Sequence, residues 1–120
     1  MTSAWATQAS HESKVATIAA AMRDRAASGD VVDDVGKGDV KHVVPLHGAA
    51  RPRRSSLDLA ALDQVIDIDV ERRTCVAESA VPFKEVVRAT LAHGLLPKVV
   101  PELKGITVGG AVVGCSVVSV

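Results

Sequence analysis

Apolar residues recur at helical spacing in two stretches of the chain, and each stretch predicts a helix. The first runs from about residue 11 to residue 27, and Gly29 follows it as a suitable C-cap. The second lies within residues 79–92, where Pro82 suits the first turn and Gly94 ends the helix. The apolar positions are Val15, Ile18, Ala19 and Met22 in the first helix, and Phe83, Val86, Val87, Thr90 and Leu91 in the second. We expect each apolar face to pack on a sheet, with Phe83 as a core anchor.

Short β-prone runs predict strands on either side of the second helix. Residues 57–59 and 65–69 fit two strands joined by a turn, and a polar connection leads to a third strand at 74–78. The alternating sequence at 66–69, IDID, places its two aspartates on the face opposite the isoleucines. Solvent exposure is therefore favoured over an acid/base pair for these carboxylates. Residues 95–100 are expected to form a further strand, which completes a β-α-β unit.

The rest of the first half of the chain has a less regular pattern. Residues 1–10 fit a loose leader, and residues 30–56 mix valine-rich runs with glycine, proline and charge. Val31-Val32 and Val40 to Val44 are candidates for short strands around a turn at Gly36-Lys37-Gly38, with a loop from Pro45 to Ser56.

The composition fits one domain and argues against several classes of protein. The chain has 120 residues, and 48% of them are hydrophobic, which is enough for one core. Fourteen basic and fourteen acidic residues give zero formal net charge, so no global field favours nucleic acid or an anionic membrane. Cys75 and Cys115 lack the spacing of a metal site or a disulfide framework. The N-terminus lacks the pattern of a secretory signal, so a cytoplasmic location is expected.

Two groups of basic residues invite a binding role. The cluster Arg51-Pro52-Arg53-Arg54 can neutralise phosphates, but four residues do not make a patch, and a solvated loop end is favoured. The four histidines, His11, His42, His47 and His93, share no ligand spacing. Surface or packing roles are favoured for them over metal binding or flavin attachment.

The strongest candidate for a binding site lies near the end of the chain. The β-branched run Ile106-Thr107-Val108 leads into Gly109-Gly110, and paired glycines permit φ > 0 and close approach to backbone N–H donors. Such a loop suits a diphosphate, although a tight turn without a ligand fits these residues about equally well. The glycine spacing matches neither a Rossmann nor a P-loop motif. The uncharged run at 106–120 is too short to cross a membrane, and it is a candidate surface for self-association.

Several short motifs occur in an order that resembles a known flavoprotein family. They are Leu59-x-x-Leu62-Asp63, Ile66 to Asp69, Thr74 to Glu78, His93-Gly94-Leu95, Pro101-Glu102-Leu103 and Ile106 to Gly110. Together they are similar to the N-terminal FAD-binding half of the vanillyl-alcohol-oxidase flavoproteins, the PCMH-type FAD-binding domain. Within that family the resemblance is to FAD-linked oxidases of the delta(24)-sterol reductase type.

The resemblance implies an α+β fold, namely an incomplete PCMH-type FAD-binding domain with the first α/β subdomain and the start of the second. Residues 1–29 would form a leader and helix, and residues 30–120 a partial domain truncated at its C-terminal end. Noncovalent FAD would place its diphosphate at the N–H groups of 107–111 and its flavin beside 101–106. The implied cofactor-binding residues are Pro101, Glu102, Leu103, Ile106, Thr107, Val108, Gly109, Gly110, Ala111, Gly114 and Ser116.

Two positions depart from the pattern of this family. Ala80 stands where relatives have a permissive glycine, and Val118 stands where they have a glutamate. The acid/base residues of the family would lie on elements absent from this chain, so no catalytic residue is nominated. The expected function is FAD binding as the N-terminal part of a flavin-dependent oxidoreductase that is inactive alone. The alternative is a truncated remnant or small interaction module that binds no cofactor and buries residues 106–120 against a partner.

Overall fold

The computed structural model describes residues 4–30, 34–36 and 56–114 of the chain. These residues form α1 (Ala4–Ser28), β1 (Asp34–Gly36), β2 (Ser56–Asp58), β3 (Val65–Asp69), β4 (Thr74–Ala77), α2 (Phe83–Leu91) and α3 (Val108–Val113). Strands β1 and β2 pair in parallel, whereas β3 and β4 form an antiparallel hairpin. Helices together with a small antiparallel sheet agree with the predicted α+β class.

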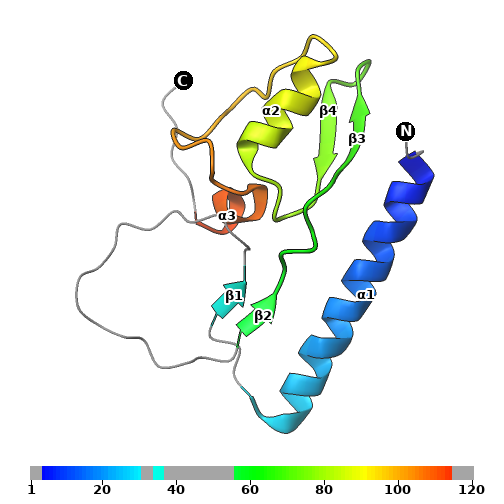
Figure 1. Ribbon diagram of the computed structural model, residues 1–120, viewed down its shortest axis with the longest axis vertical. Coiled ribbons are helices and arrows are strands. Elements are labelled where there is room, and N and C mark those ends of the chain that lie inside the picture. Colours follow the sequence, from blue (N-terminus) through cyan, green and yellow to red (C-terminus); the bar gives the residue numbers. More distant parts are fainter. Residues whose placement is uncertain (1–3, 31–33, 37–55, 115–120) are drawn as a thin grey trace.

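The β3–β4 hairpin lies between α1 and α2 (Figure 1), where α1 contacts β2 and β3 and α2 contacts both hairpin strands. The alternating pattern of β3 has the predicted effect, since Ile66 is buried and Asp67 is exposed. The strand register shifts between Val65 and Asp67, which marks a bulge. The core is small and consists of Leu57, Leu62, Ile66, Ala80, Val81 and Val86.

Helix α2 matches its prediction closely. It begins directly after Pro82, and Val86 and Thr90 are buried on its inner side. Gly94 follows the helix with φ of 71°, a left-handed conformation that favours glycine. Phe83 is only half-buried, so it is a weaker core anchor than expected, and Leu91 is exposed.

Helix α1 is longer than predicted, and a different side of it is covered. It begins at Ala4, so the expectation of a loose leader is wrong for residues 4–10, whereas the C-cap Gly29 is confirmed by its φ of 76°. The half-buried positions include His11, Lys14 and Ile18. Of the predicted apolar face, Ile18 and Ala19 are half-buried as expected, whereas Val15 and Met22 are 43% and 51% exposed. A polar contact of α1, described below, explains this orientation.

Other predicted elements differ from the structure or lie outside the described residues. Residues 95–100 form no strand, because Pro97 lacks a backbone N–H for sheet pairing, and the expected β-α-β unit is absent from the described part. Gly36 is the last residue of β1, and Lys37 and Gly38 of the predicted turn lie outside the described residues. The expectations for Val31-Val32, Val40 to Val44, His42, His47, Arg51 to Arg54, Cys115, Ser116 and Val118 fall outside the described residues.

Candidate functional site

The predicted glycine loop is the first turn of helix α3 rather than a loop with φ > 0. Thr107 is the N-cap of α3, with an extended backbone at φ −81° and ψ 155°. Its Oγ1 accepts a hydrogen bond from the Gly110 N–H at 3.1 Å. Neither Gly109 nor Gly110 has a positive φ. The expected loop is therefore a helix start, because Thr107 caps α3, and the positive φ that paired glycines permit is not adopted here.

Helix α3 is attached to the rest of the molecule mainly through backbone hydrogen bonds to the segment from Glu78 to Pro82, which we call the 78–82 turn. The Gly109 N–H donates to the Ser79 carbonyl at 2.8 Å, and the Val108 N–H donates to the Val81 carbonyl at 2.9 Å. Pro82 and Thr107 form an isolated antiparallel bridge. The start of α3 is thus attached to this turn by the kind of backbone pairing that joins two strands.

Gly109 is required here by close approach of the two backbones. A Cβ at position 109 would lie 2.8 Å from the Ser79 Cβ and 3.1 Å from the Ser79 carbonyl oxygen. Contacts that short force the backbone to move, so only glycine fits without a shift. The prediction of a close approach at Gly109 is correct, but the approaching group is the protein's own turn.

Four of the backbone donors that were expected to hold a diphosphate already have acceptors. Val108 and Gly109 donate to the 78–82 turn, Gly110 donates to the Thr107 side chain, and Ala111 donates to the Thr107 carbonyl at 2.9 Å. Contact between these N–H groups and FAD stays a prediction. Such contact would require each N–H group to share its hydrogen bond between FAD and its present acceptor, or to give up that acceptor.

A pocket of about 390 Å³ lies beside the glycines, and we call it the glycine pocket. It is lined by Leu59, Ser79, Ala80, Thr107, Gly109, Gly110, Val113 and Gly114. Thr107, Gly109, Gly110 and Gly114 had been predicted as cofactor-binding residues, so the structure brings four of these residues together at one pocket. Leu59, Ser79, Ala80 and Val113 were missed, because they reach the pocket only through the packing of α3 on the 78–82 turn.

The other predicted cofactor-binding residues lie away from the glycine pocket. Val108 lines a groove of about 830 Å³ between β4 and α2, together with Phe83 and Cys75. Pro101 is buried, Glu102 and Leu103 are exposed, and Ile106 and Ala111 are half-buried without lining either cavity. Ser116 lies outside the described residues.

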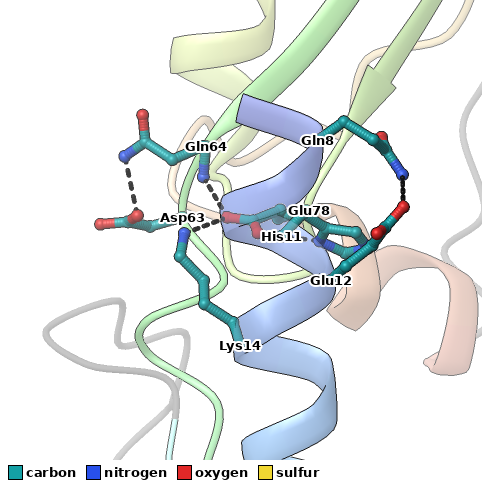
Figure 2. Close-up of polar contacts among 7 residues, drawn as sticks. All are labelled: Gln8, His11, Glu12, Lys14, Asp63, Gln64 and Glu78. Carbon is teal, nitrogen blue, oxygen red and sulfur yellow. Dashed lines mark hydrogen bonds and ion pairs between the residues drawn. The ribbon is translucent and has the colours of Figure 1, made fainter. Parts of the chain in front are cut away.

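A buried carboxylate, Glu78, lies at the start of the 78–82 turn. Only 1% of its side chain is exposed. It accepts hydrogen bonds from His11 Nδ1 at 2.9 Å, from Lys14 Nζ at 3.0 Å and from the Gln64 N–H at 2.8 Å. Figure 2 shows the carboxylate of Glu78 facing His11 and Lys14 of α1. Because an ionised carboxylate only accepts, His11 Nδ1 carries the hydrogen of its bond.

These partners decide the ionisation of Glu78. Burial raises the pKa of its carboxyl group, but the hydrogen bonds from His11, Gln64 and Lys14 and the charge of Lys14 outweigh burial. The pKa of Glu78 is therefore lowered from its ordinary value, and the group is ionised at neutral pH. The pairing also turns the polar side of α1 inward, which leaves Val15 and Met22 exposed.

Sequence reasoning assigned Glu78 to a family motif but gave it no role. His11 and Lys14 lie 67 and 64 residues from it along the chain, so no local pattern links the three side chains. The available signal was indirect: a His and a Lys three positions apart face the same side of a helix.

Comparison with known proteins identifies the family of the chain. A family model described as the FAD binding domain matches residues 8–118. The chain belongs to the FAD binding domain family. No solved structure matches it significantly.

Two curated relatives of this FAD binding domain are oxidoreductases. The chain is 38% identical over 58 residues to a delta(24)-sterol reductase homolog from Caenorhabditis elegans, which covers 48% of the chain and 11% of the relative. It is 34% identical over 61 residues to decaprenylphosphoryl-beta-D-ribose oxidase from Mycolicibacterium smegmatis, which covers 51% of the chain and 13% of the relative. The matched region is thus little more than a tenth of each curated relative. The predicted resemblance to FAD-linked oxidases and delta(24)-sterol reductases is confirmed.

The lining of the glycine pocket carries no charge. The pocket's volume of about 390 Å³ falls at the lower end of the range of about 300–1,000 Å³ that is usual for ligand sites. No charged side chain lines it, and its walls are apolar side chains, glycines and the two hydroxyl residues Ser79 and Thr107.

Among residues 4–30, 34–36 and 56–114, no three His, Cys, Asp or Glu side chains are placed to share a metal ion. No helix in the described part is long and apolar enough to cross a membrane. Burial and the charge of Asp67 raise the pKa of the Cys75 thiol, which disfavours the reactive thiolate.

Proposed function

We propose that this FAD binding domain holds an uncharged portion of FAD in the glycine pocket, as part of a flavin-dependent oxidoreductase. The observation that carries the proposal is the pocket itself, where four of the predicted cofactor-binding residues meet. The family match over residues 8–118 supplies the identity of the ligand. The diphosphate would be held by groups other than the paired N–H donors at the start of α3.

The chain's own residues bind and orient the cofactor in this proposal. Leu59 and Val113 supply apolar walls, and Gly110 and Gly114 leave room beside the helix. When bound, FAD supplies the capacity to accept or deliver a hydride, and protein groups supply position and electrostatics. No described residue is nominated for acid/base catalysis.

We propose that substrate turnover involves further segments of a longer flavin domain. The matched region covers 11% and 13% of the two oxidoreductase relatives, which supports the proposal that the chain is the first part of a longer flavin domain. We therefore propose that the chain is inactive alone and acts in the cytoplasm as the N-terminal part of such an enzyme. The names of the relatives suggest two candidate activities, the reduction of a sterol and the oxidation of a phosphoryl-linked ribose.

A pair of neighbouring substitutions on α3 tests the pocket. Val113 lines the pocket and is 85% exposed, whereas Val112 is 76% exposed and does not line it. Val113→Trp should obstruct the pocket without disturbing the core, and Val112→Trp is the matched control. FAD affinity of the full chain would be measured by equilibrium dialysis, and FAD retention by visible absorbance after desalting.

We expect the wild-type chain and Val112→Trp to bind FAD equally well, and Val113→Trp to bind about tenfold more weakly, a difference of about 1.4 kcal/mol. A folded wild-type chain that binds no FAD would contradict the proposed function. Equal affinity of all three proteins would show that FAD binds elsewhere on the domain.

Self-association without a cofactor is the second candidate function. The observation that favours it is the exposure of Val112 and Val113, which present an apolar surface on α3. Zero formal net charge means that no overall repulsion opposes contact between copies. Sedimentation velocity over a concentration series should then show dimers that Val112→Asp abolishes. A monomer at all concentrations would rule this function out.

A further inference from the structure

The 78–82 turn connects the Glu78 cluster to the glycine pocket over a very short length of chain. The side chain of Glu78 is held by α1 and Gln64, and the next two residues, Ser79 and Ala80, line the pocket. The Ser79 carbonyl also accepts the Gly109 N–H, which attaches α3 to this side of the pocket. Glu78 is therefore one residue from a hydrogen bond that joins two sets of lining residues.

The backbone of the turn is fixed at several further points. The Glu78 N–H donates to the Gln64 carbonyl at 2.9 Å, and the Ala80 N–H donates to the Leu62 carbonyl at 2.8 Å. Within the turn, the Val81 N–H donates to the Glu78 carbonyl at 3.2 Å. The 78–82 turn thus joins α1, the 62–64 segment and α3, with Glu78 making the contacts to α1.

We infer that Glu78 is a positioning residue for the FAD pocket, holding the Ser79–Ala80 wall and the start of α3 through its contacts with His11 and Lys14. This inference rests on the proposed function, since it concerns the same pocket. It adds that helix α1, which does not line the pocket, contributes to cofactor affinity. Loss of the Glu78 charge should loosen the wall and weaken FAD binding while the rest of the domain stays folded.

His11 and Lys14 are the ionisable side chains that bond to Glu78, and the neighbouring acids have other partners. From α1, Glu12 is close to the cluster, but it accepts a hydrogen bond from Gln8. From the segment before β3, Asp63 accepts from the Gln64 side chain. Both acids are directed to these amides in Figure 2. Replacement of Glu78 by glutamine therefore removes one charge at the centre of the cluster and keeps the side-chain size.

The test compares Glu78→Gln with two other variants of the full chain. Lys14→Met is the milder second variant, since it removes one donor and keeps an apolar stem on a partly exposed residue. Glu85→Gln is the matched control, because Glu85 pairs with Arg88 on the surface of α2 and lines neither cavity. Two quantities are measured: the dissociation constant for FAD, and amide hydrogen exchange at Val108 and Gly109 without FAD. Amides of α2 serve as internal references for exchange.

We expect Glu78→Gln to raise the dissociation constant for FAD at least about fivefold and to speed exchange at Val108 and Gly109 by a similar factor. Lys14→Met should do the same to a smaller extent, and Glu85→Gln should change neither quantity. A purely structural role would instead speed exchange in α2 equally and leave the affinity of the folded fraction unchanged.

The outcomes separate this inference from the proposed function. The inference is wrong, and the proposed function stands, if the wild-type chain binds FAD and both variants behave like it. Glu78→Gln and Lys14→Met would then bind FAD with full affinity, and amide exchange at Gly109 would be as slow as in the wild type. If the folded wild-type chain does not bind FAD, the proposed function fails and the inference fails with it. Should Glu78→Gln not fold, Lys14→Met decides between these results.

Discussion

Helices α1 and α3 are attached to the same short turn in two different ways. Helix α1 is held through side chains, with His11 and Lys14 bonded to the buried carboxylate of Glu78. Helix α3 is held through the backbone, with Val108 and Gly109 bonded to Val81 and Ser79. One attachment is polar and buried, and the other leaves apolar side chains such as Val112 exposed.

The difference decides what can break each attachment. A side-chain attachment depends on the identity and charge of a few groups, so one substitution or one proton removes it. A backbone attachment survives most substitutions, because every residue but proline carries the same donor and acceptor. It is broken by steric conflict where two backbones approach closely, as they do at Gly109 and Ser79.

The largest effect is expected from Glu78→Ala, which removes the polar attachment. It leaves His11 and Lys14 without their shared acceptor, and we expect the free energy of unfolding to fall by about 3 kcal/mol. Urea denaturation monitored by circular dichroism measures this change. Glu85→Ala, which removes an exposed ion pair of α2, should cost about 0.5 kcal/mol or less. Equal losses in the two variants would mean that burial of Glu78 has no energetic consequence.

Gly109→Ala should have the next largest effect, because it breaks the backbone attachment. The new Cβ would meet Ser79 at 2.8 Å, and we expect a loss of about 2 kcal/mol, typical of overpacking. The control is Gly105→Ala, since a Cβ at Gly105 has no atom within 4 Å and its φ is not positive. That variant should be neutral or slightly more stable in the same denaturation experiment. A stable Gly109→Ala protein would show that α3 can move away from the turn at little cost.

The parts of the fold that the sequence predicts are those that local chemistry decides. Alternation alone identifies β3, and the need for a left-handed residue identifies Gly94 after α2. The inward face of α1 is decided by Glu78, more than 60 residues away, so apolar spacing pointed to Val15 and Met22 instead. Contacts of that range leave no periodic signal in the sequence.

The candidate site shows the same limit. Adjacent glycines after a β-branched run correctly indicated a close backbone approach, and Thr107, Gly109, Gly110 and Gly114 do line one pocket. Their helical conformation was not predictable, because a six-residue helix with two glycines has little intrinsic propensity. Its conformation follows from the Thr107 cap and from pairing with the 78–82 turn.

Acid should weaken the α1 attachment and spare the α3 attachment. The pKa of Glu78 is lower in the folded chain than in the unfolded chain, so the unfolded chain binds more protons and stability falls as pH falls. The contribution of Glu78 is complete above the ordinary carboxyl value of about 4.3 and is lost as pH falls through the lowered value. The difference in the free energy of unfolding between the wild type and Glu78→Gln should therefore shrink below about pH 4.3. We expect this decrease to be smaller than the loss of stability in Gly109→Ala. A constant difference from pH 7 to pH 3 would contradict the lowered pKa.

The smallest effect is expected at the cap of α3, where a side chain assists the backbone attachment. Thr107 is 4% exposed, and its Oγ1 accepts from the Gly110 N–H at 3.1 Å. Thr107→Ala should cost about 1 kcal/mol, because it leaves the Gly110 N–H without its acceptor at a buried position. Thr107→Ser keeps the hydroxyl and should recover more than half of that loss in denaturant unfolding. If serine and alanine are equally destabilising, the stabilising group of Thr107 is its buried methyl group and not its hydroxyl. Helix α3 is then attached by backbone pairing and packing alone.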